Sequence, residues 1–205
     1  MKKYKVIIFD LDGVLINSKI NMNLAWNKVR KVTQVKKTFN EYFKFIGLPF
    51  NEILKKLKIK DIHHEKIEKT YSKHSIKKLK KIKLYKKVNY VLRILKKKKI
   101  KMCIVTSKDG KRTKEIIRHF NIPIKYSFSP TRNLRGKPHP DKINKALEFL
   151  SSKKKDACYV GDMFVDYKTA KNAKIDFIYA DYGYSKLKKN FNVILKKPED
   201  IIKYI

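Results

Sequence analysis

The sequence predicts an α/β fold, a doubly wound parallel sheet with an inserted all-helical domain. Short apolar segments rich in β-branched residues end in aspartate, glycine or threonine, and amphipathic helical segments lie between them. After the first apolar segment, about 70 residues carry helical patterns only. Strands that alternate with helices of this length form right-handed βαβ units, and therefore a parallel sheet covered on both faces. With 205 residues, 42% of them hydrophobic, the chain can bury such a core.

Five apolar runs are predicted to be strands. The first, Tyr4–Phe9, is a β-branched run that ends at Asp-Leu-Asp-Gly, as a buried strand would. The other four are Met102–Val105, Ala157–Val160, Asp176–Tyr179 and, with a weaker pattern, Lys125–Phe128. Apolar residues recur at helical spacing in the segments between them, which are Lys86–Lys99, Lys111–Asn121 and Pro140–Ser151.

Residues 15–83 break this alternation because they contain no convincing strand. Helices are predicted over Ser18–Val32, Phe39–Ile46, Pro49–Leu57 and Asp61–Ile82, with Pro49 as a first helical residue and Asp61 as an N-cap. Four aromatic side chains are expected to pack inside this block, although one of them could face a substrate: Trp26, Phe39, Phe43 and Phe45. We therefore predict a core domain of residues 1–14 and 84–205 and an inserted helical domain of residues 15–83.

The chain is strongly basic, since 53 lysines and arginines against 18 acidic residues give a net charge of +35. Clustered cations bind nucleic-acid phosphates. Here, however, 47 of the 53 cations are lysines spread along the chain, whereas specific recognition favours the bidentate arginine fork. Solvated faces of amphipathic helices are the preferred interpretation, and a surface that binds nucleic acid or another polyanion is the alternative.

The sequence also bears on the cellular compartment. No apolar run approaches the roughly 18 residues of a membrane span, and the apolar stretch Val6–Phe9 is too short for a secretory signal. Two cysteines, Cys103 and Cys158, are too few for a disulfide scaffold or a cysteine-rich metal site. We expect a cytoplasmic protein with no membrane partner.

Polar residues follow the predicted strands at the point where each strand ends. Because the carboxyl ends of parallel strands share one edge of an open sheet, residues there are expected to converge on one ligand site. The candidates are Asp10, Asp12, Thr106, Asp162 and Asp166, together with Lys137 from the loop that leads to the Ala157 strand.

These residue types suit phosphoryl transfer. Carboxylates gathered at one edge repel one another unless a hard cation such as Mg²⁺ lies among them. One carboxylate can attack phosphorus, and a second, two residues further on, can protonate the leaving oxygen and then activate water. The Thr106 hydroxyl and the Lys137 ammonium would bind phosphate oxygens. The Ser107 hydroxyl could also reach the phosphate. Gly13 permits a tight turn in which the backbone approaches the ligand closely.

Four segments resemble the motifs of the haloacid dehalogenase (HAD) superfamily. They are Phe9–Leu15, Ile104–Thr106, Gly136–Pro140 and Gly161–Asp166. Their order and spacing are most similar to the phosphoglycolate phosphatase and β-phosphoglucomutase-like branch, which has a Rossmann-like core and a helical cap inserted after the first motif.

The resemblance implies a role for each motif residue. Asp10 would be the nucleophile, Asp12 the general acid and base, and Thr106 and Lys137 the phosphate ligands. Mg²⁺ would be held by Asp10, the Asp12 backbone carbonyl and Asp162, with Asp166 in support. Asp12 also argues against the dehalogenase and phosphonatase branches, which lack an aspartate at that place.

Three functions are compatible with these residues. A Mg²⁺-dependent phosphatase that hydrolyses a small phosphorylated metabolite, a phosphomonoester, through an aspartyl-phosphate is favoured. A phosphomutase of a sugar phosphate on the same fold is one alternative, and a basic polyanion-binding protein on a HAD scaffold is the other. Two departures leave the substrate and the cap hinge open: Asn17-Ser18 stands where relatives have Asp-Ser, and Leu84–Lys87 where many have Pro-Gly.

Some further residues invite a functional interpretation that we consider weaker. Arg132 and Arg135 flank the Lys137 loop, and we expect them to be solvated, with binding of a substrate anion as the alternative. His63, His64 and His74 are expected on the surface, since adjacent histidines point to different sides of a helix. In the sheet order of the family the two cysteine-bearing strands flank the first strand, roughly 10 Å apart. That separation predicts two buried thiols without a disulfide.

Overall fold

The computed structural model describes residues 2–131 and 133–205 and contains a six-stranded sheet at its centre. The strands run parallel in the order β5-β4-β1-β6-β7-β8. Their bounds are β1 Val6–Phe9, β4 Lys101–Val105, β5 Tyr126–Phe128, β6 Ala157–Gly161, β7 Asp176–Ala180 and β8 Ile194–Leu195. The five predicted strands are confirmed to within two residues, and β8 was missed because two residues carry no periodic signal.

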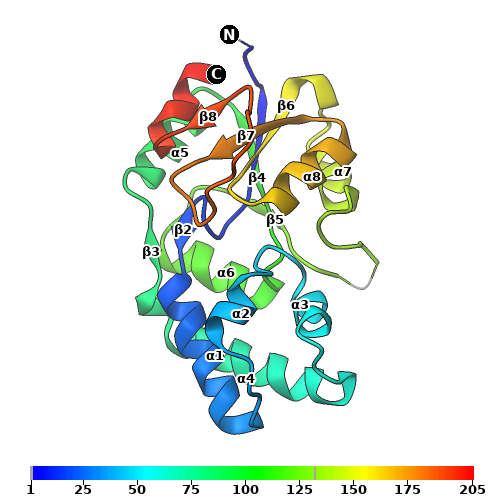
Figure 1. Ribbon diagram of the computed structural model, residues 1–205. Coiled ribbons are helices and arrows are strands. Elements are labelled where there is room, and N and C mark those ends of the chain that lie inside the picture. The colour runs from blue at the N-terminus through cyan, green and yellow to red at the C-terminus, as the bar shows by residue number, and fades with distance from the viewer. Residues whose placement is uncertain (1, 132) are drawn as a thin grey trace.

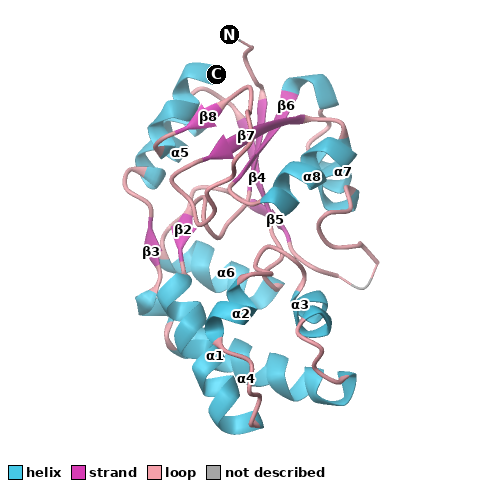
Figure 2. Ribbon diagram, in the orientation of Figure 1, coloured by secondary structure: helices cyan, strands magenta, loops and turns pink. Residues whose placement is uncertain are grey.

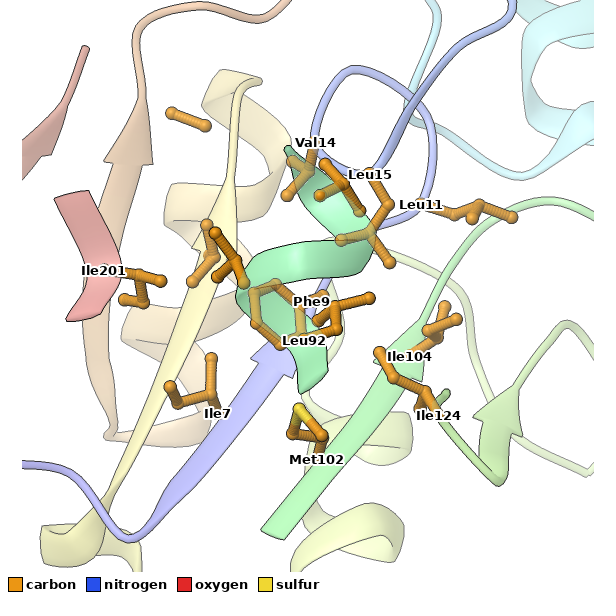
Figure 3. Close-up of a cluster of buried hydrophobic side chains, with 14 of the residues drawn as sticks. Ile7, Phe9, Leu11, Val14, Leu15, Leu92, Met102, Ile104, Ile124 and Ile201 are labelled. Atoms are coloured by element: carbon orange, nitrogen blue, oxygen red, sulfur yellow. The ribbon is translucent and has the colours of Figure 1, made fainter. Parts of the chain in front are cut away.

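Helices cover both faces of the sheet, which confirms the doubly wound architecture (Figure 1 and Figure 2). They are α5 Val88–Lys97, α6 Gly110–His119, α7 Asp141–Phe149, α8 Phe164–Ala173 and the 3₁₀ helix Pro198–Tyr204. Ile7 and Phe9 of β1 pack into the cluster beneath α5 (Figure 3). Val6 and Ile8 pack into the opposite cluster, with α7 and α8. This alternation, with all four residues buried, is why β1 reads as an uninterrupted apolar run.

Helices of the inserted segment gather at one end of the molecule and have a hydrophobic core of their own. They are α1 Lys19–Thr33, α2 Phe39–Phe43, α3 Phe50–Lys56 and α4 His64–Lys77, with short 3₁₀ turns at Asp61–His63 and Leu79–Lys81. Trp26 stacks on Tyr42 at a ring-centroid distance of 4.4 Å in the middle of this core. Phe39 and Phe45 pack against the same cluster, as predicted.

Several details of this segment differ from the prediction. Asp61 is not an N-cap, because it lies inside the 3₁₀ turn with its carboxylate 3.5 Å from His64 Nε2. Pro49 is itself the N-cap residue of α3, one position before the first helical residue. The predicted surface position of His64 is wrong: its ring is buried and Nε2 lies 2.8 Å from the Ile59 carbonyl oxygen.

A short antiparallel ribbon joins the helical segment to the sheet. It consists of β2 Ile16–Asn17 and β3 Lys83–Leu84, with Ile16 paired to Leu84. The expectation that residues 15–83 contain no strand is therefore wrong at both ends, because strands of two residues cannot show alternation. The chain leaves the sheet and returns to it at this ribbon, where the predicted domain boundaries fall.

Cys103 lies on β4 and Cys158 on β6, on either side of β1, and both are buried free thiols, as predicted. Within residues 2–131 and 133–205, no helix has the length and apolar character that a membrane crossing requires.

Candidate active site

The residues predicted to converge come from three neighbouring strands. Asp10 directly follows β1, and its N–H donates to the Val160 carbonyl oxygen at 2.9 Å. Thr106 follows β4, where its N–H donates to Phe128 of the adjacent strand at 3.1 Å. Asp162 follows β6. The backbone pairing of the sheet thus holds these three side chains at the same edge.

Three buried carboxylates form a cluster at this edge. One oxygen each of Asp10, Asp162 and Asp166 lies within 4.8 Å of the other two. The Lys137 ammonium is placed between two of them, 2.9 Å from Asp10 Oδ1 and 2.7 Å from Asp166 Oδ1. Asp166 also accepts the Met163 N–H at 3.0 Å and so caps α8. Asp166 therefore caps α8 and belongs to the carboxylate cluster at the same time.

The cluster carries more negative charge than its single ammonium balances. Burial raises the pKa of Asp10 to about 7, with Lys137 opposing the shift and Asp166 and Asp12 adding to it. Burial is the main reason why the pKa of Asp162 lies well above its usual range, and repulsion from Asp166 and Asp10 raises it further. Burial acts to lower the pKa of Lys137, but attraction by Asp10 and Asp166 outweighs it and raises that pKa. An additional positive charge would relieve this repulsion.

Two carboxylate oxygens of the cluster have capacity to bind such a charge. Among the described residues, Asp162 Oδ1 accepts no hydrogen bond. Asp10 Oδ1 faces the Lys137 ammonium without hydrogen-bond geometry. Buried oxygens without a donor are costly, and hard divalent cations prefer oxygens of this kind. The donor set therefore fits Mg²⁺.

Asp12 lies apart from this cluster and has different partners. Its Oδ2 is 3.1 Å from the Lys108 ammonium, and its Oδ1 accepts a hydrogen bond from the Ser18 hydroxyl. Ser18 in turn lies 3.1 Å from the Tyr184 hydroxyl, and the Tyr184 N–H donates to Asp162 Oδ2 at 2.7 Å. Asp12 is thus oriented by neighbours that differ from those of Asp10.

Three weaker candidates, Ser107, Arg132 and Arg135, were considered as ligands of a substrate anion. The Ser107 hydroxyl donates to the Gly47 carbonyl oxygen at 2.6 Å, so it contacts the helical segment. Arg135 is exposed and pairs with Asp141 at 3.0 Å, which agrees with the solvated position expected. Arg132 lies outside the described residues.

A cavity of about 40 Å³ separates the sheet edge from the helical segment. The sheet side contributes the candidate residues Asp10, Asp12, Thr106, Ser107 and Lys137. The helical side contributes mainly apolar and aromatic residues, among them Met22, Tyr42, Leu48, Phe50 and Tyr71. Within the described residues, none of the four aromatic side chains singled out in the sequence lines this cavity. Phe43 instead packs edge-on against Tyr184, at a centroid distance of 5.4 Å.

Sequence reasoning missed two cations of this cavity, Lys108 and Arg112. Lys108 lies two residues after Thr106, but it was indistinguishable among 47 lysines. Arg112 is one of only six arginines. That scarcity, together with its place in the first turn of the helix after Thr106, was the available signal.

Gly13 allows the first loop to approach the cluster closely. Its φ is +86°, and a Cβ at this position would lie 2.2 Å from Asp162 Oδ2. We expect Gly13→Ala to displace Asp162 and to destabilise the protein by about 1–3 kcal/mol through backbone strain alone. Urea unfolding would measure the loss. Gly110→Ala is the matched control, since a Cβ there would meet only Ser129 Cβ at 3.8 Å. Equal stability of the two variants would contradict the expectation.

The chain is similar to known hydrolases over most of its length. The model of the haloacid dehalogenase-like hydrolase family matches residues 7–180. The chain is 30% identical over 204 residues to a phosphoglycolate phosphatase of Aquifex aeolicus, covering 97% of this chain and 95% of that one. It is 32% identical over 188 residues to a candidate pyrophosphatase of Caldanaerobacter subterraneus, covering 84% of this chain and 80% of that one.

The fold has close counterparts among solved structures. A candidate phosphoglycolate phosphatase from Lactobacillus plantarum superposes with a TM-score of 0.90 at 22% identity, covering 99% of this chain and 100% of that one. The family match spans most of the chain, and the motif residues lie together at one sheet edge. The chain therefore belongs to the haloacid dehalogenase-like hydrolase family and resembles its phosphoglycolate phosphatase branch.

Proposed function

We propose that this phosphoric monoester hydrolase is a cytoplasmic, Mg²⁺-dependent phosphatase of a small phosphorylated metabolite and acts through an aspartyl-phosphate on Asp10. We further propose that residues 15–83 are its cap and residues 1–14 and 84–205 its catalytic core. The observation that carries the proposal is the separation of two carboxylates in one cavity. Asp10 lies with Lys137 and the acidic cluster, whereas Asp12 pairs with Lys108.

In the first half of the reaction, an Asp10 carboxylate oxygen would attack phosphorus. A bond from that oxygen to phosphorus forms while the bond from phosphorus to the leaving oxygen breaks, and Asp12 donates its proton to the leaving oxygen. Thr106 and Lys137 line the same cavity. There they would bind the equatorial phosphate oxygens, where negative charge is spread in the transition state.

In the second half, the Asp12 carboxylate would take a proton from water as that water attacks phosphorus. The phosphorus bond to Asp10 breaks, phosphate leaves and both carboxyl groups return to their starting states. The apolar and aromatic side chains of the helical segment would limit access of bulk water meanwhile.

Two buried oxygens of the cluster, Asp10 Oδ1 and Asp162 Oδ1, accept no hydrogen bond from the described residues, and this supports a bound Mg²⁺. Asp10, Asp162 and the Asp12 backbone carbonyl would hold it, with Asp166 in support. When bound, it would neutralise part of the negative charge of the phosphoryl group and the cluster.

Phosphate release from a panel of phosphorylated metabolites tests this proposal. We expect turnover with MgCl₂ and its loss in excess chelator, restored when Mg²⁺ is added back. Product analysis separates hydrolysis from the mutase alternative, because a mutase yields an isomerised sugar phosphate in place of free phosphate. Undiminished turnover in chelator would contradict the metal dependence.

A further inference from the structure

Lysines line a hollow at the edge of the sheet where the strands begin, opposite the edge that holds Asp10. The hollow is formed by the residues that lead into β1, β4 and β6. Six of its eleven lining residues are lysines, which is more than twice the share of lysine in the whole chain. These exposed side chains are Lys5, Lys98, Lys99, Lys101, Lys153 and Lys155. The density of positive charge in this lysine hollow therefore exceeds what the composition of the chain accounts for.

Most of these lysines have no partner within the protein. The Lys101 ammonium donates to the carbonyl oxygens of Leu150 and Ser151 at the end of α7. In the described part of the chain, the other five form no hydrogen bond or ion pair through Nζ, and Asp156 is the one acidic residue that lines the hollow. Unpaired ammonium groups gathered in one place repel one another. Binding of a chain of anionic groups would relieve that repulsion.

A second hollow, lined by aromatic side chains, lies along the same edge where β7 and β8 begin. The Phe191 ring packs against Tyr167 and Phe177 at centroid distances of 5.5 and 5.3 Å, and all three rings are half-buried. The Lys189 ammonium lies 4.0 Å from the centre of the Tyr167 ring. This aromatic hollow therefore offers ring surface beside a cation.

The N-terminal segment joins the two hollows. Lys2 and Tyr4 line the aromatic hollow, and Lys5 lines the lysine hollow. Lys2 also pairs at 2.6 Å with Asp176, the one acidic side chain that the described residues contribute to the aromatic hollow. The two hollows follow the beginnings of the strands from β4 to β8, which span roughly 19 Å at about 4.8 Å between neighbouring strands. The inserted helices lie at the opposite end of the molecule (Figure 1).

The chemistry of the two hollows together selects the partner. Lysines that neutralise backbone phosphates release counterions and bind without reading the base sequence. Aromatic side chains stack with the bases of a single strand, whatever the base. The bases of a duplex are already stacked inside the helix, so a duplex would use the lysine hollow alone. A polyanion without bases, such as inorganic polyphosphate, would do the same.

We propose that this edge of the sheet is a binding surface for single-stranded nucleic acid. The phosphates lie along the lysine hollow, and the bases stack in the aromatic hollow against Phe191 and its neighbours. The surface is at the edge opposite Asp10 and Asp162, so the inference does not rest on the proposed function.

The salt dependence of binding tests the lysine hollow. Fluorescence anisotropy of a labelled oligodeoxythymidylate of about 12 nucleotides measures binding with no phosphorylated metabolite present. We expect the variant with Lys98→Gln, Lys99→Gln and Lys153→Gln to show a slope of log affinity against log salt that is smaller by about 2, because each phosphate contact of a single strand contributes about 0.7.

A matched triple variant separates this surface from net charge alone. It replaces three exposed lysines of the inserted helical segment by glutamine, so both triple variants lose the same charge. These lysines are Lys56, Lys60 and Lys66. We expect the control triple variant to keep the wild-type slope. An equal loss of slope in the two variants would overturn the proposed surface, because net charge would then account for the binding.

The aromatic hollow is tested by Phe191→Leu, which removes the ring but keeps an apolar side chain against Tyr167. We expect about tenfold weaker binding of the oligonucleotide, since stacking with a base is lost, and unchanged binding of inorganic polyphosphate. Phe43→Leu is the control, because Phe43 is equally half-buried but lies in the inserted helical segment.

Comparison of ligands tests the choice of partner. The wild-type protein should bind the oligonucleotide more tightly than a duplex of the same length or inorganic polyphosphate of the same charge. Equal affinity for all three ligands would overturn the assignment to single strands, as would unchanged oligonucleotide binding in Phe191→Leu. Phosphate release from the metabolite panel is measured separately, so failure of this inference and failure of the proposed function are distinguishable.

Discussion

Asp10→Asn is expected to lower phosphatase turnover by about 10⁴-fold or more, since the covalent route then has no nucleophile. Asparagine keeps the size of the side chain, so the cavity and the contacts of β1 should be preserved. The measurement is phosphate release with saturating Mg²⁺, combined with mass spectrometry of acid-quenched enzyme. The wild-type peptide that contains residue 10 should carry a phosphoryl group during turnover, and the variant peptide should not. Full turnover by the variant would refute the mechanism.

Stability provides the folding control for this variant. The pKa of Asp10 is raised from its usual 3.8 to about 7, chiefly by burial. The folded protein therefore retains a proton that the unfolded chain releases, and the contribution of Asp10 to stability becomes less favourable as pH rises from about 4 to 7. Asparagine removes this effect. In chelator we expect Asp10→Asn to gain stability relative to wild type as pH rises over that range, as urea unfolding at several pH values would measure. A difference in stability between the variant and wild type that stayed constant from about pH 4 to pH 7 would contradict this expectation.

The elements that could be predicted are those whose burial produces a recognisable pattern in neighbouring residues of the sequence. β1 is buried on both faces, so it appears as a run of apolar residues, and the aspartates directly after it mark the end of the strand. The same reasoning located Thr106 and Asp162 at the ends of β4 and β6. In a parallel sheet all of these strand ends lie at one edge, so their convergence could be predicted before the strand order was known.

Features that depend on contacts between distant segments could not be predicted, because they produce no pattern in the local sequence. The hydrogen bond from Ser107 to Gly47 joins residues 60 positions apart, so neither residue alone indicates it. Lys108 differs from the surface lysines only in being buried against Asp12. His64 likewise is buried by packing that its helical periodicity does not reveal. Burial of a polar side chain is a tertiary property, which composition in a lysine-rich chain conceals.

Lys137→Met is expected to have the second largest effect, on both stability and activity. Lys137 is 3% exposed and is the only cation within 4 Å of the cluster carboxylates among the described residues. Its removal leaves Asp10 and Asp166 buried without a counter-charge, and losing one member of a buried ion pair costs about 3–5 kcal/mol. Turnover should fall by about 10²–10³-fold even at saturating Mg²⁺, because a cation that stabilises the transferring phosphoryl group is lost.

The response of this variant to Mg²⁺ distinguishes an electrostatic role of Lys137 from simple packing. Without the ammonium the carboxylates repel one another more strongly, so a divalent cation should raise the melting temperature of Lys137→Met by more than it raises that of wild type. Differential scanning calorimetry in chelator and in Mg²⁺ measures both increments. Lys145→Met on the same stretch of chain is the control, since its side chain is half exposed and pairs with Glu148. If Mg²⁺ stabilised the Lys137→Met variant no more than wild type, the cluster would not be the cation site. The metal would then have to be sought away from Asp10, Asp162 and Asp166.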